Sequence, residues 1–154
     1  QDEKGRKNVI MLVDCGTRVY PVGRLDMDSE GLLILTNDGD FANKMLHPAH
    51  EVEKIYEVWV ENASQPGIAQ MMTPMVIDGY QIRPAGVKTL WLRDGSAKLQ
   101  VTIHEGRNRQ IRKMAAQCGM TVTRLKRVQE GSLKLGALPV GQWRYLTKNE
   151  ISML

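Results

Sequence analysis

The sequence contains only two cysteines among its 154 residues. Cys15 and Cys118 lie far apart and have no C-x-x-C spacing, so neither a disulfide framework nor a cysteine-based zinc site is supported. The polar start QDEKGRKN does not resemble a signal peptide. We therefore expect two reduced thiols in a cytoplasmic protein, because the cytosol keeps cysteines reduced.

Long apolar runs, internal repeats and low-complexity tracts are also missing. The apolar run from Leu32 to Leu35 is far shorter than the roughly 20 residues that a membrane-spanning helix needs, so we expect no membrane association. The composition, 42% hydrophobic and 25% charged, is ordinary for a globular protein. The length favours one domain, residues 1–154, with a sizeable core.

Metal-ligand patterns are weak. His47 and His50 form an H-x-x-H pair in a predicted loop, and His104 is distant in sequence. We interpret the pair as structural or RNA-facing, because two histidines without further ligands do not make a metal site. The sequence predicts no metal.

Positive charge is concentrated in one segment. The chain carries a net charge of +4 and has a pI of about 9.2. Residues 104–127 hold seven of the 21 Lys/Arg and one of the 17 Asp/Glu, a net charge of +6, which leaves −2 for the remainder. Such a local field indicates either a face that binds phosphates or a solvated basic helix.

Hydrophobic periodicity predicts more strands than helices, and therefore an α+β fold with a largely antiparallel sheet. Asp40 is the expected N-cap of a helix that ends before Pro48. Val9–Val13 fits either a short helix or a strand. The predicted strands are Leu32–Thr36, Lys54–Glu61, Val87–Leu92, Lys98–His104 and Val122–Val128, with short ones near Leu133 and at Arg144–Leu146. The other predicted helices are 66–72 and 108–118.

Carboxylates crowd around the strand at Leu32. Asp26, Asp28, Glu30 and Gly31 match the first half of a calcium loop, but the twelfth position, which needs a bidentate Glu, is Asn37. Turn and cap chemistry accounts for most of these acids. On spacing alone, Asp26 is either a structural ion-pair partner or a catalytic carboxylate.

Four segments follow one another along the chain: GRLDMDSEGLLILTNDG, EVEKIYEV, HEGRNRQIRKM and TRLKRVQEGSLKLGALPVGQWRYLT. In this order they resemble the RsuA/RluB family of ribosomal RNA pseudouridine synthases. The resemblance spans roughly residues 4–150. It implies the pseudouridine synthase fold, a largely antiparallel mixed sheet with flanking helices and a central catalytic cleft.

The resemblance also implies roles for single residues. Asp26 matches the catalytic aspartate, Tyr56 the tyrosine that stacks on the target base, and Arg112 the basic residue that pairs with the aspartate. Leu125 matches an apolar residue of the uracil pocket, and Arg24 lies beside the nucleophile, where it could fill the space of the flipped nucleotide. The implied substrate-binding set is completed by Lys54, Arg107, Arg109 and Arg127.

The implied activity is the isomerisation of uridine to pseudouridine in ribosomal RNA, with large-subunit (23S) RNA favoured. No cofactor is expected, because nothing is oxidised and no group is added. An ionised aspartate suits this chemistry as nucleophile or base, and we expect Arg112 to keep Asp26 ionised. The alternatives are a non-catalytic RNA-binding or ribosome-assembly module, and a hydrolase that uses Asp26.

The resemblance is to a catalytic domain. The small N-terminal RNA-binding domain and the first strand of the family are not expected in this sequence, and standalone activity and oligomeric state stay open.

Overall fold

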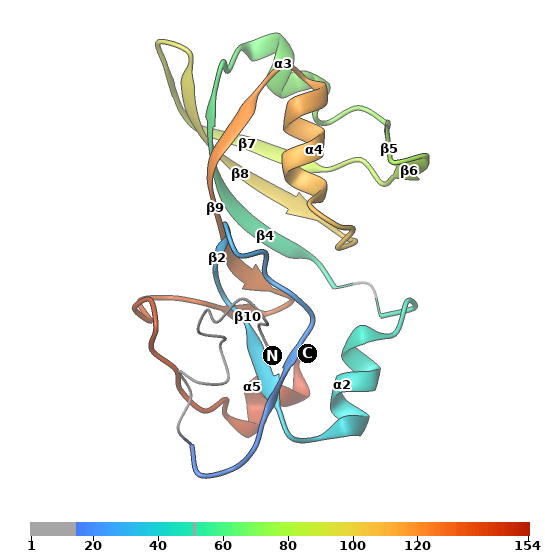
Figure 1. Ribbon diagram of the computed structural model, residues 1–154, viewed down its shortest axis with the longest axis vertical. Coiled ribbons are helices and arrows are strands. Elements are labelled where there is room, and N and C mark those ends of the chain that lie inside the picture. The colour runs from blue at the N-terminus through green and yellow to red at the C-terminus, as the bar shows by residue number, and fades with distance from the viewer. Residues whose placement is uncertain (1–14, 51) are drawn as a thin grey trace.

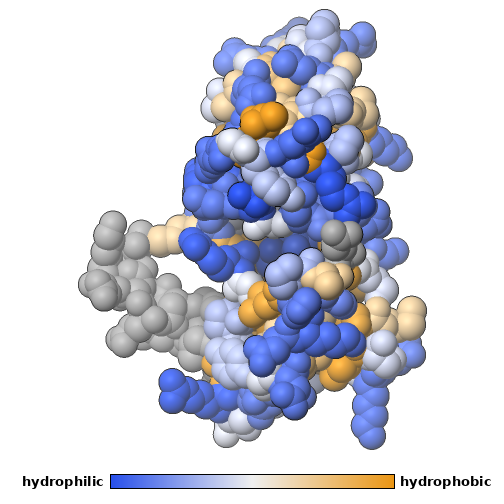
Figure 2. Space-filling view, turned by 90° about the vertical axis from the view of Figure 1, so that its right-hand side faces the viewer, coloured by the Kyte–Doolittle hydropathy of each residue, from blue (hydrophilic) through white to orange (hydrophobic). Residues whose placement is uncertain are grey.

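The computed structural model describes residues 15–50 and 52–154. Figure 1 shows two parts, one above the other, joined where strands of the main sheet run from the upper part to the lower part. The segment Val9–Val13, expected as a helix or strand, lies outside the described residues. In Figure 2 the surface is indented between the two parts and is hydrophilic over much of both.

The main sheet has the strand order β10-β9-β4-β8-β7, and all of these pairs are antiparallel. A short strand, β2, adds to β9 in parallel, which confirms a largely antiparallel mixed sheet. Its strands are β2 (Glu30–Gly31), β4 (Lys54–Glu61), β7 (Gly86–Arg93), β8 (Ser96–Ile103), β9 (Thr121–Glu130) and β10 (Leu133–Lys134).

One face of this sheet is covered by α3 (Gln65–Gln70) and α4 (Gln110–Gln117) (Figure 1). The predicted alternation along β4 is confirmed, since Tyr56, Val58 and Val60 are buried. They pack in one core cluster with helical residues such as Ile111 and Met114. Trp59, between them in sequence, lies on the other face.

A second, smaller core lies in the lower part. Strand β1 (Tyr20–Val22) pairs with β3 (Ile34–Thr36), followed by α2 (Gly39–Leu46), and α5 (Lys148–Ser152) lies near the C-terminus. The buried members of this cluster come from distant segments: Val22, Leu32, Ile34, Ala42, Met45, Leu133 and Leu154.

Two local predictions are wrong. Asp38, not Asp40, caps α2: its side chain accepts hydrogen bonds from the backbone N–H groups of Asp40 and Phe41, so the helix begins two residues earlier, at Gly39. Residues 144–146 form no strand. Arg144 instead binds Glu150 of α5 through both carboxylate oxygens, at 2.8 and 2.7 Å, and this local pair takes the place of a strand partner.

Several short strands and one short helix were not predicted from the sequence. These are β1, α5 and the hairpin of β5 (Met75–Ile77) and β6 (Tyr80–Ile82). Short strands of three residues carry too little alternation to be recognised. Among the helices of the described ranges, none is long and apolar enough to cross a membrane.

Candidate active site

The loop that carries Asp26 is anchored to β9 through Gly31. Gly31 has a φ of +114°, and a Cβ atom there would lie 2.2 Å from the carbonyl oxygen of Arg127. The next residue, Leu32, donates its backbone N–H to that same oxygen at 2.8 Å. Only glycine permits so close an approach of two backbones, so Gly31 sets where the loop docks.

The side chain of Arg127 fastens both ends of the same loop. Its Nε donates to the carbonyl of Leu32 at 2.8 Å and its Nη1 to the carbonyl of Arg24 at 3.3 Å. Arg127 is only 4% exposed, and Glu130, equally buried, lies 3.8 Å from its Nε. The planar guanidinium thus satisfies backbone carbonyls on either side of Asp26, and the predicted contact of Arg127 with substrate stays a prediction.

The turn before α4 faces this loop. Gln110 is buried and holds the turn: its Oε1 accepts from the backbone N–H of Arg107, and its Nε2 donates to Glu105, both at 3.2 Å. Arg109, directly before the helix, has a φ of +52°. A left-handed conformation is rare for a residue other than glycine and is often found at functional sites.

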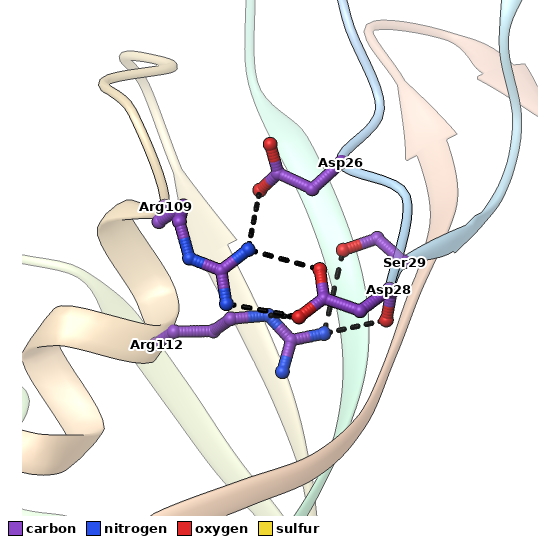
Figure 3. A network of polar contacts seen from close by, with 5 residues as sticks. All are labelled: Asp26, Asp28, Ser29, Arg109 and Arg112. Atoms are coloured by element: carbon purple, nitrogen blue, oxygen red, sulfur yellow. Dashed lines mark hydrogen bonds and ion pairs between the residues drawn. The ribbon is translucent and has the colours of Figure 1, made fainter. Parts of the chain in front are cut away.

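Arg109 reaches across to two carboxylates of the loop, as Figure 3 shows. Its Nη1 and Nη2 donate to the two carboxylate oxygens of Asp28, each at 2.9 Å. Its Nη1 also lies 3.8 Å from Oδ2 of Asp26, beyond hydrogen-bond distance. Asp26 itself is partly exposed, at 22% of its side chain. The guanidinium is thus bound to Asp28 and only near Asp26.

Arg112, one turn further along α4, contacts Asp28 rather than Asp26. Its Nη2 donates to the backbone carbonyl of Asp28 at 2.6 Å and to Oγ of Ser29 at 3.5 Å. Its Nε lies 3.6 Å from Oδ2 of Asp28. The expected direct pair between Arg112 and Asp26 is therefore replaced, in the described residues, by a pair between Arg109 and Asp26 (Figure 3).

These contacts fix the charge of Asp28. The hydrogen bonds from Arg109, and then the charges of Arg112 and Arg109, lower the pKa of Asp28 despite some desolvation. The same hydrogen bonds raise the pKa of Arg109. Asp28 is therefore ionised and Arg109 cationic throughout the neutral range.

Tyr56 and Lys54 project from β4 beside this network. Tyr56 is 8% exposed and lies opposite Arg127 in the strand register. Burial raises the pKa of Tyr56, opposed by the charge of Arg127, so its phenol is protonated at neutral pH. Burial likewise lowers the pKa of Lys54, whereas the charge of Glu130 raises it.

The remaining predicted substrate-binding residues are dispersed. Arg24 is exposed at the start of the loop, and Leu125 lies within the main core, opposite Val58. Arg107 stacks over the ring of Tyr80 in the β5–β6 hairpin, with 3.8 Å from its Cζ to the ring centroid. This hairpin is further tied to α4 by an ion pair between Lys113 and Asp78.

Sequence reasoning missed the role of Asp28, which it assigned to turn chemistry. Asp28 and Arg109 are 81 residues apart, and no periodicity reveals such a pairing. The calcium interpretation loses its ligands, because Asp28 binds Arg109 and Glu30 binds Arg124 through both oxygens, at 2.8 and 3.0 Å.

Comparison with known proteins places residues 3–117 in a match to the family model described as RNA pseudouridylate synthase. The chain is 40% identical over 158 residues to ribosomal large subunit pseudouridine synthase B of Bacillus subtilis (strain 168), covering 100% of this chain and 65% of that protein. It is also 40% identical to ribosomal large subunit pseudouridine synthase E of Xanthomonas campestris pv. campestris, covering 82% and 76% of the two chains.

The fold agrees with a solved structure described as a pseudouridylate synthase. The TM-score is 0.83 at 30% sequence identity, over 94% of this chain and 64% of that chain. The chain spans 65% and 61% of the lengths of two of its most similar relatives, the second being an RNA pseudouridine synthase of Aquifex aeolicus (strain VF5).

Proposed function

The chain belongs to the RNA pseudouridylate synthase family, and from this premise we propose that it isomerises a uridine of ribosomal RNA to pseudouridine. The observation that carries the proposal is the convergence of a partly exposed carboxylate, Asp26, with Arg109 and the buried Tyr56. The relatives named for the large ribosomal subunit favour 23S RNA as the substrate.

Asp26 is the reacting carboxylate. As a nucleophile it attacks ribose C1′ and displaces uracil N1, and C5 of the turned base then displaces the carboxylate from C1′. As a base it removes the C2′ proton while the C1′–N1 bond breaks, and a proton returns to C2′ when C5 bonds to C1′ of the glycal. In both routes the hydrogen of C5 leaves as a proton, and N1 takes up a proton. Every atom of the uridine other than exchanged hydrogen is retained, so we expect neither a metal nor a cofactor.

Tyr56 and Leu125 are the side chains proposed to hold the flipped base. Extrusion of a stacked nucleotide costs a few kcal/mol, which aromatic and apolar contacts offset. The protonated phenol of Tyr56 can donate a hydrogen bond or pass a proton. Leu125 is buried in the main core, so only its edge would meet the base.

Exposed cations around the loop and the α4 turn are proposed to bind the RNA backbone. Arg24 and Arg107 are exposed, and Arg112 and Lys54 contribute charge nearby. Because phosphate contacts release counterions, binding should weaken steeply as salt rises. We place this activity in the cytoplasm, where ribosomal RNA and reduced cysteines occur together.

The test is release of tritium from C5-labelled uridine in transcribed ribosomal RNA, for the parent chain and for Asp26→Asn. Release by the parent alone is the expected result, since asparagine cannot act as nucleophile or base. Release by both would refute the role of Asp26. Release by neither, with RNA bound equally, would identify a non-catalytic RNA-binding module.

A further inference from the structure

In the network shown in Figure 3, Arg109 is bound mainly to Asp28, a residue that the proposed chemistry does not use. Both donors at the tip of the Arg109 guanidinium bind Asp28 at 2.9 Å, whereas Asp26 is 3.8 Å away. Two parallel hydrogen bonds fix the plane of a guanidinium as well as its position. The orientation of Arg109 toward Asp26 is therefore set by Asp28.

Asp28 is also bound by Arg112. This arginine donates to the backbone carbonyl of Asp28 at 2.6 Å, and its side chain is only 14% exposed. Asp28 thus has a fixed backbone and a fixed carboxylate, both attached to α4. An exposed ion pair contributes little to stability, and Asp28 is 51% exposed, so stability alone does not explain the arrangement.

The consequence lies in what Arg109 is prevented from doing. Without Asp28, Asp26 is the carboxylate nearest to its guanidinium. A bidentate pair with Asp26 would occupy both carboxylate oxygens, which must stay free for attack at C1′ or for proton abstraction.

We propose that Asp28 is a positioning residue that occupies Arg109 and so keeps the carboxylate of Asp26 free to react, with a cation held nearby. This inference rests on the proposed function. Asp28 itself touches neither the base nor the ribose in this scheme; it acts through Arg109.

The chain offers a matched control on the same loop. Glu30, two residues after Asp28, binds Arg124 through both oxygens at 2.8 and 3.0 Å. This pair is similarly exposed, at 30% and 50% of the two side chains. The guanidinium of Arg124 stacks on Trp59, at 4.3 Å from the ring centroid, on the face of the sheet away from Tyr56.

The experiment measures single-turnover tritium release from labelled ribosomal RNA at rising enzyme concentration. This yields a limiting rate constant and a half-saturating concentration for the parent, Asp28→Asn, Asp28→Glu and Glu30→Gln. We expect Asp28→Asn to lower the limiting rate by roughly 10- to 100-fold, as a small misplacement of a reacting group does, with half-saturation changed less than about threefold. Asp28→Glu should retain more of the rate, and Glu30→Gln should match the parent.

A coupling measurement separates positioning from direct participation. In the Arg109→Met background the guanidinium that Asp28 binds through both oxygens is absent, so Asp28→Asn should lower the limiting rate much less than it does in the parent. An equal loss in both backgrounds would overturn the inference, as would a limiting rate within twofold of the parent or a loss confined to half-saturation.

Stability and function are distinguished by two further outcomes. Thermal unfolding of Asp28→Asn and Glu30→Gln should agree within a few degrees; a much lower midpoint for Asp28→Asn would overturn the inference in favour of a structural role. No tritium release by the parent at any concentration would refute the proposed function and this inference together, whereas parental release with an unimpaired Asp28→Asn refutes the inference alone.

Discussion

The two hydrophobic clusters of the molecule differ in how completely they exclude water. In the upper cluster nine of the 18 buried residues, among them Val58, Leu99 and Met114, are 0–1% exposed and the others reach up to 8%, whereas all buried residues of the lower cluster keep 3–9% of their surface. The upper cluster lies between a four-stranded stretch of the main sheet and two helices (Figure 1). A sheet face covered by helices buries apolar surface efficiently.

The lower cluster is assembled from segments that meet only in the folded chain, such as Val22, Met45 and Leu154. It contacts the upper part through β2, β9 and β10. The loop of Asp26 lies at this junction. The well-packed upper part thus supports the lower part, and the docking of β2 on β9 sets the position of Asp26.

The largest loss of stability should come from Gly31→Ala, because this substitution disrupts the backbone contact between β2 and β9 at the junction of the two parts. The added Cβ would meet the backbone of Arg127 at 2.2 Å, with φ at +114°. We expect a loss of about 3 kcal/mol or more in the free energy of unfolding, together with loss of tritium release. Urea titration followed by fluorescence and circular dichroism measures the first effect.

The matched control for this change is Gly79→Ala in the β5–β6 hairpin. Gly79 has a φ of +78° and no atom within 4 Å of a built Cβ. Only conformational strain remains, so the loss should be about 1–2 kcal/mol. Equal losses at the two glycines would show that strain, rather than the close approach to β9, determines the effect.

An intermediate effect should follow from removing the same side chain in each cluster. Met114→Ala, at 0% exposure in the upper cluster, should cost about 3 kcal/mol, and Met45→Ala, at 6% exposure, about 2 kcal/mol. Urea unfolding of both variants measures the difference. A larger cost for Met45→Ala would reverse the ranking of the two clusters.

The smallest effect concerns the pH dependence of the lower part. Hydrogen bonds from Arg144 and the Thr147 backbone lower the pKa of Glu150 from 4.5 to about 2. A carboxyl whose pKa is lower in the folded state contributes stability above pH 4.5, and this contribution is lost as the pH falls toward 2. The protection factors of the α5 amides, which compare the exchange rate with that of an unstructured chain at the same pH, should therefore fall over that range.

Glu150→Gln provides the comparison for this pH window. The variant should exchange faster than the parent at pH 7 and converge with it near pH 2, because glutamine has no charge to lose. Parallel exchange curves from pH 7 to pH 2 would exclude Glu150 as the source of the pH dependence.

Sequence patterns predicted the upper part better than the lower. The apolar patterns of Lys54–Glu61 and Val87–Leu92 are local signals, and both strands are found as expected. The turn that joins β7 to β8 has Asp94 and Gly95 at positive φ. In the lower part, Asp38 and Asp40 are both suitable N-cap residues, so residue type alone does not predict which of them caps α2. The helix begins at Gly39, and Asp38 is the cap. The strand expected at 144–146 was displaced by the ion pair of Arg144 with Glu150.

The site shows the same limit. Asp26, Tyr56 and Arg112 are assigned through ordered motifs, and their catalytic roles stay predictions. The contacts of Arg109 and Arg127 with the Asp26 loop could not be predicted. In sequence these two arginines look like the other cations of the basic segment, and only the folded chain brings them to the loop. Arg127 is buried and binds the backbone of the Asp26 loop, a structural role that the sequence did not predict beside its expected contact with substrate.

The pairing of β2 with β9 has a consequence for the order of folding. Leu32 and Arg127, whose backbones meet there, are 95 residues apart. Closing so long a loop is slow compared with forming the neighbouring hairpins, because the entropy of closure must be overcome before the contact stabilises anything. On a translating ribosome, the strand that receives the Asp26 loop emerges after most of the chain. We therefore expect Asp26 to reach its position only near the end of folding, after the sheet that carries Tyr56 has formed.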